Sequence, residues 1–112
     1  MIDASAIAEI IATYNKYGWI LRRVLLSDAS NEKLGKHKET LFGEATISVS
    51  EIDAAWFSRP PDKNGVAWEI RYLGEPPYAL LEKVNEGDAE FEKILRQTES
   101  RLNESLTQKQ TA

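Results

Sequence analysis

Five side chains on neighbouring predicted strands have types and spacings suited to ligand binding: Trp56, Arg59, Trp68, Arg71 and Tyr72. Tryptophan and tyrosine can line an apolar pocket, and an arginine beside them can fix an anion. The same aromatic rings could instead fill the space between a sheet and its helices. They could also face outward as a hot spot of a protein interface. Core filling is the simplest of the three interpretations, and all three remain open from the sequence.

Acid–base or nucleophilic catalysis would have to use His37, the only histidine of the chain. It lies in a lysine-rich segment that we expect to be a mobile loop. A catalytic base must be held within hydrogen-bond reach of its nucleophile, which a loose loop does not provide. The chain also lacks the G-x-S-x-G nucleophile motif. The sequence therefore predicts no catalytic residues and favours a protein that is not an enzyme.

Metal and cofactor sites have little support in the sequence. The chain has no cysteine, so one histidine leaves only carboxylates as further ligands. Glu51 and Asp53 could hold a hard cation, but their spacing does not resemble that of a calcium-binding loop. Glycine-rich phosphate-binding motifs are absent as well. We expect no bound metal and no cofactor.

The basic residues Lys33, Lys36, His37 and Lys38 could contact phosphates. Acidic residues flank this segment, no aromatic residue interleaves it, and the chain carries a net charge of −4. A solvated charge run is therefore the better interpretation, and nucleic acid is not an expected partner. No apolar run approaches the ~20 residues that span a bilayer, so no membrane association is expected. The absence of cysteine and of a signal peptide favours a cytoplasmic location.

The stretch 54–84 predicts three consecutive antiparallel strands. Apolar and polar residues alternate over 66–73, which is the period of a strand with one buried face. A shorter strand over 54–59 should stop at Pro60-Pro61, because proline cannot donate to a sheet ladder. The turn-forming segment 60–65 then joins the two strands as a hairpin. A third strand over 78–84 would complete a meander.

Two amphipathic helices and two more strands are predicted around this meander. Apolar residues recur at helical spacing over 3–17, with Asp3 as N-cap, and again over 88–106. Residues 19–26 and 45–49 read as strands. The first is apolar on both faces, which indicates an interior strand or a strand covered by helices on one side and by an interface on the other. The segment 27–43 stays ambiguous between a sparse helix and a mobile loop with one helical turn.

The predicted fold is an α+β protein in two layers. An antiparallel sheet of about five strands, including the meander 54–84, would pack against the N-terminal and C-terminal helices. Residues 1–106 would form a single domain, and 107–112 a frayed C-terminal tail. In the strand over 19–26, Arg22 and Arg23 should lie on opposite faces. Each needs an exit to water or a carboxylate partner, for which Glu69 and Glu82 on neighbouring strands are candidates.

In its small size, acidic pI and antiparallel sheet between terminal helices, the chain resembles the bacterial secretion-chaperone class, which binds effector chains as dimers. The resemblance covers overall layout without a matching motif, and segment 27–43 departs from the order of that class. We predict a small acidic protein that acts as a non-catalytic interaction or adaptor module, forms a homodimer and binds a protein partner. The alternative is a binder of, or an enzyme acting on, an anionic or aromatic ligand, with a pocket built from tryptophans and Arg59 or Arg71.

Overall fold

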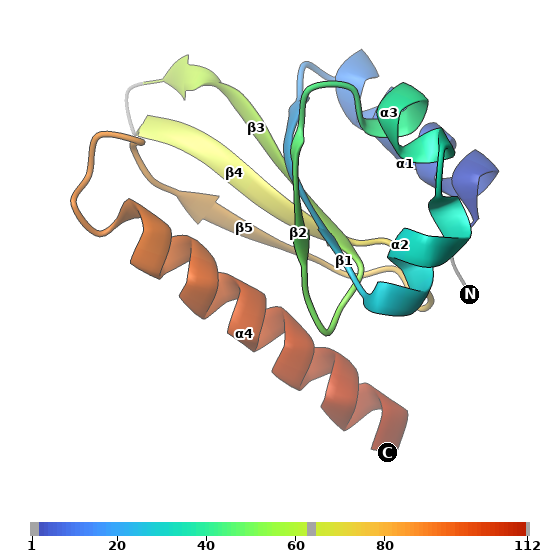
Figure 1. The fold of residues 1–112 in the computed structure, drawn as a ribbon. Coiled ribbons are helices and arrows are strands. Elements are labelled where there is room, and N and C mark those ends of the chain that lie inside the picture. Colours follow the sequence, from blue (N-terminus) through green and yellow to red (C-terminus); the bar gives the residue numbers. More distant parts are fainter. Residues whose placement is uncertain (1–2, 63–64, 112) are drawn as a thin grey trace.

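A five-stranded mixed sheet with helices on both of its faces organises the chain (Figure 1). The structure is a computed structural model that describes residues 3–62 and 65–111. The elements in chain order are α1 (Ala4–Lys16), β1 (Ile20–Leu26), α2 (Asp28–Leu34), α3 (His37–Phe42), β2 (Thr46–Val49), β3 (Ala54–Asp62), β4 (Gly65–Tyr72), β5 (Ala79–Lys83) and α4 (Phe91–Thr111).

The strands lie in the order β2-β1-β3-β4-β5, with β2 and β5 at the two edges. The pairs β1–β3, β3–β4 and β4–β5 are antiparallel, so the sheet is mostly antiparallel, and β3, β4 and β5 are neighbours in chain order. β2 pairs in parallel with β1, which corrects the expectation of a wholly antiparallel sheet. The physical reason is the crossover through α2 and α3, because it is long enough to return the chain in the same direction.

The molecule has three layers, whereas we predicted two. In Figure 1, α4 crosses one face of the sheet, and α1, α2 and α3 lie on the other. One core cluster joins Trp56 and Trp68 to apolar residues of α4, including Leu102. A second cluster joins Phe57 to the N-terminal helices, where Ile7 is fully buried. The central strands are apolar on both faces, so each face requires its own cover.

The N-terminal helix is specified at both ends, as its sequence predicts. The Asp3 carboxylate accepts a hydrogen bond from the Ala6 N–H at 3.0 Å, which satisfies one of the free donors of the first turn. Gly18, just past the other end, has a φ of 88°. Glycine adopts this left-handed conformation without steric cost, so the chain can leave the helix and enter β1.

The ambiguous segment 27–43 forms two short helices. Ser27 caps α2 through a 3.2 Å hydrogen bond from the Ser30 N–H to its hydroxyl. Each helix is followed by a glycine with positive φ, Gly35 at 47° and Gly43 at 57°. Leu34 and Phe42, the last residues of the two helices, are buried in the second core cluster. Leu34 and Phe42 are buried by residues that are distant in the sequence. The local pattern of apolar residues therefore does not predict these two helices.

One strand and one helix extend well past their predicted ends. β3 continues through Pro60-Pro61 to Asp62, with a shift of register between Arg59 and Asp62. Proline is tolerated in such an irregular stretch because it interrupts the ladder. The predicted turn residues 63–64 lie outside the described residues. α4 extends to Thr111, beyond the predicted end near Leu106, so the helix takes in most of the tail.

Substitutions on both faces test the three-layer arrangement. Ile7 on α1 and Leu102 on α4 are both fully buried, on opposite sides of the sheet. We expect Ile7→Ala and Leu102→Ala each to lower the free energy of unfolding by about 2–5 kcal/mol, because each leaves a cavity. Urea denaturation measures both values. If either variant is as stable as the parent chain, the corresponding helix does not cover its face.

Candidate functional site

The five residues predicted as a ligand site are divided between the two faces of the sheet. Trp56, Trp68 and Tyr72 belong to the α4 face. Arg71 pairs with Ala55, a residue of the opposite core, and Arg59 lies over the ring of Trp19 on that same side. The sheet therefore separates both arginines from the tryptophans that they were expected to assist.

The tryptophans of the α4 face are core residues. Trp56 and Trp68 are 0% and 1% exposed, and their rings meet edge to face at a centroid distance of 6.3 Å. Trp68 also packs edge to face against Phe91 of α4. The Trp56 indole N–H donates to the Glu99 carboxylate at 2.8 Å. Within the part of the chain that the structure describes, the Trp68 indole N–H has no hydrogen-bond partner.

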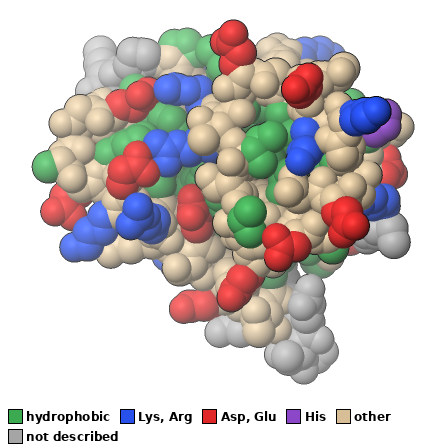
Figure 2. Space-filling model, in the orientation of Figure 1, with side chains coloured by type: hydrophobic (Ala, Val, Ile, Leu, Met, Phe, Trp, Pro, Cys, Tyr) green, Lys and Arg blue, Asp and Glu red, His purple; other side chains and the backbone are tan. Residues whose placement is uncertain are grey.

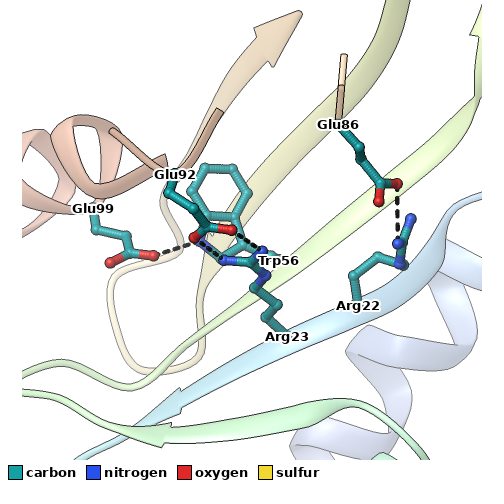
Figure 3. Close-up of polar contacts among 6 residues, drawn as sticks. All are labelled: Arg22, Arg23, Trp56, Glu86, Glu92 and Glu99. Carbon is teal, nitrogen blue, oxygen red and sulfur yellow. Dashed lines mark hydrogen bonds and ion pairs between the residues drawn. The ribbon is translucent and has the colours of Figure 1, made fainter. Parts of the chain in front are cut away.

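Arg22 and Arg23 are the cations that accompany the tryptophans. A β-bulge in β1 falls between Leu21 and Arg23, which pair with Phe57 and Trp56 respectively. The extra residue at a bulge interrupts the alternation of side chains. As a result both arginines lie on the α4 face, which corrects the prediction that they point to opposite faces. Their carboxylate partners also come from the α4 side rather than from neighbouring strands (Figure 3).

Arg23 clamps the first turn of α4 to the sheet. Its guanidinium forms two hydrogen bonds with the Glu92 carboxylate, at 2.8 and 2.7 Å, and lies 5.4 Å from the centroid of the Phe91 ring. The paired geometry suits a guanidinium and a carboxylate, whose donors and acceptors match two by two. This hydrogen bonding raises the pKa of Arg23 and lowers the pKa of the Glu92 carboxyl.

Arg22 holds the segment that leads into α4. Its guanidinium is 3.0 Å from the Glu86 carboxylate, donates to the Ser58 hydroxyl at 3.1 Å, and lies 4.9 Å from the Trp68 ring centroid. Anion binding at this position would require displacement of Glu86. Together the two arginines hold α4 over the tryptophans, so the contacts in Figure 3 have a structural role. We call the Arg22–Glu86 and Arg23–Glu92 pairs the clamp.

The opposite face carries a separate polar cluster around Tyr14. Its ring stacks on Phe57 at a centroid distance of 4.0 Å, and its hydroxyl donates to the Glu69 carboxylate. Burial and this hydrogen bond both raise the pKa of the Tyr14 phenol. A neighbouring cavity of about 360 Å³ is lined by Tyr14 and Arg71, but also by the carboxylates of Glu9 and Glu75. These two carboxylates oppose the anionic ligand that an arginine would otherwise favour.

The most open part of the sheet is the edge strand β2. All of its residues are exposed, including Ile47 at 40% and Val49 at 69%. Figure 2 shows hydrophobic side chains at the surface in the middle of the view, over the position of β2 in Figure 1. We predicted a half-buried strand here from its alternation. The strand exists, but the helices of that face cover β1 and β3 instead of β2.

Comparisons with known proteins provide no analogue: no family model, curated protein or solved structure matches the chain. Over residues 3–62 and 65–111, no three histidine or acidic side chains are grouped so that they could hold a metal ion. No helix in these ranges combines the length and apolar character needed to cross a membrane. The surface feature that offers a candidate interaction site is the exposed edge strand β2.

The clamp predicts a pH-dependent contribution to stability. We expect Glu92→Gln to lower the free energy of unfolding by about 0.2–1 kcal/mol at neutral pH, because this pair is largely solvent-exposed. The folded state lowers the pKa of Glu92, so the contribution is present above the unfolded-state value of about 4.3. It is lost as the pH falls through the lower folded-state pKa.

Urea denaturation of the parent and the variant at neutral and acidic pH measures this contribution. Glu90→Gln is the matched control, because the Glu90 carboxylate pairs with the exposed Lys93 ammonium at 3.6 Å. A difference between parent and Glu92→Gln that stays constant, or grows, toward acid would contradict the clamp.

Proposed function

We propose that the protein is a non-catalytic protein–protein interaction module that binds through the free edge of β2. The observation that carries the proposal is the exposure of Ile47 and Val49, at 40% and 69%, on an edge strand. An edge strand presents unpaired backbone N–H and C=O groups, which another extended chain can join. Main-chain hydrogen bonds then give affinity, and neighbouring side chains give specificity.

The composition of β2 supports this proposal. Its sequence, Thr-Ile-Ser-Val, is uncharged and contains two β-branched apolar residues that favour extended pairing. Proteins commonly protect an edge with a charged residue or a proline. β2 has neither, whereas β5 at the other edge carries Glu82 and Lys83. The contrast favours β2 as the interaction edge, and a chaperone-like module could add a client segment there.

Ligand binding in a tryptophan–arginine pocket, the alternative function, receives less support. Arg59 and Arg71 lie on the face opposite Trp56 and Trp68. The tryptophans themselves are covered by α4, and Arg22 and Arg23 beside them are paired with carboxylates. A ligand at the tryptophans would have to displace α4 or its ion pairs.

A photo-crosslinking residue at position 47 tests the interaction edge in cells. We expect crosslinked products at this position and far fewer from the same residue at Leu81, which is 55% exposed on β5. Val49→Glu should remove most of these products, because it places a charge against the joining strand. Its stability should change by no more than about 0.5 kcal/mol, as is usual for an exposed position.

Mass spectrometry identifies the crosslinked chain, and circular dichroism with urea denaturation verifies the fold of Val49→Glu. If positions 47 and 81 give equal products, or if Val49→Glu leaves the products unchanged, β2 is not the interaction edge.

A further inference from the structure

We infer that the chain that joins β2 is β2 of a second copy, aligned antiparallel about a twofold axis at Ser48. This inference rests on the proposed function and names its partner. Such an assembly would continue the sheet of one subunit into the sheet of the other. The argument follows from the backbone direction of β2, its side-chain pattern and its lack of charge.

The backbone groups that face the free edge belong to Ile47 and Val49. The Ser50 N–H donates to the Leu26 carbonyl at 2.9 Å, so Ser50 directs its backbone groups toward β1. Successive residues of a strand direct their N–H and C=O groups to alternate sides. Ser48 therefore also directs its backbone groups toward β1, and Ile47 and Val49 direct their N–H and C=O groups outward.

This alternation selects the register of an antiparallel pair. Outward-facing residues must stand opposite each other, because only they can exchange both backbone hydrogen bonds. With the axis at Ser48, Ile47 stands opposite the partner subunit's Val49, and the reverse pair follows by symmetry. An axis at Ile47 or at Val49 would pair only one of them within the strand. The axis at Ser48 is the register that uses both.

The side chains suit the same register. Ile47 and Val49 share the face of β1 residues Val24 and Leu26, so both isoleucine–valine pairs would lie on one face of the joined sheet. Cross-strand pairs of this kind stabilise antiparallel strands. No residue from 45 to 50 is charged, so a twofold axis brings no like charges directly opposite each other within the strand. Any second copy thus presents a matching strand.

The absence of cysteine from the chain allows a direct test of the axis. Residues opposite each other in a non-hydrogen-bonded pair have Cα atoms about 4.5 Å apart, within the range of a disulfide. We therefore expect Ser48→Cys to form an intersubunit disulfide in mild oxidant. Its crosslinked fraction should be several-fold above those of Ile47→Cys and Val49→Cys, with Leu81→Cys as the exposed control on β5.

Light scattering of the unmodified protein accompanies the cysteine series and should give twice the chain mass of 12.7 kDa at micromolar concentration. Val49→Glu should restore the monomer. A maximum of crosslinking at position 47, 49 or 81, or no crosslinking above that of Leu81→Cys, overturns the inference.

The two proposals fail in distinguishable ways. A monomeric protein whose position 47 captures a different chain, and whose Val49→Glu variant loses it, overturns the second copy but supports the interaction edge. A monomeric protein with no crosslinking specific to position 47 overturns both.

Discussion

Burial of β3 on both of its faces is the constraint on which the rest of the structure depends. Ala54, Ala55, Trp56 and Phe57 are consecutive and each is 0% exposed. Because successive side chains of a strand leave opposite faces, this run gives each face its own apolar surface. Trp56 requires α4, and Phe57 requires α1 and its neighbours. The three layers follow from this one strand.

The positions of the two arginines of β1 follow from the same constraint. A central strand has no room for unpaired cations, yet Arg22 and Arg23 lie in β1 beside the tryptophan layer. The bulge brings both to the α4 face, where Glu86 and Glu92 neutralise them. The arginine stems and guanidinium groups then extend the cover over the aromatic rings. The Arg22–Glu86 and Arg23–Glu92 ion pairs hold α4 against the sheet. This cluster of charges therefore has a structural role, and it does not cover the edge strands.

The parts of the fold that could be predicted from the sequence are those governed by local patterns. Asp3 and Gly18 define α1, and the alternation over 66–73 defines β4. The separation of Trp56 from Arg59 was also readable, because an odd spacing within a strand places two side chains on opposite faces. The same odd spacing separates Arg71 from Trp68, so both arginines lie on the face opposite the tryptophans.

Other features depend on contacts between distant segments. The bulge at Arg22 depends on pairing with β3, and no local pattern of apolar residues signals it. The helices of segment 27–43 depend on the burial of Leu34 and Phe42 against β1 and α1. The exposure of β2 likewise depends on which strands the helices cover. A period of two predicts that Ile47 and Val49 share a face, but not that a helix lies over it.

β2 is held to the sheet mainly by its backbone pairing with β1, because its apolar side chains remain largely in water. Burial of apolar area contributes roughly 25 cal/mol per Å², so exposed Ile47 and Val49 add little to the stability of the isolated chain. Serine or threonine at these positions would have maintained the strand without an exposed apolar surface. The two side chains gain hydrophobic stabilisation only when another chain covers them, and the unpaired backbone groups of the same two residues provide the means of attachment. Association at this edge would therefore use an apolar surface that folding leaves uncovered.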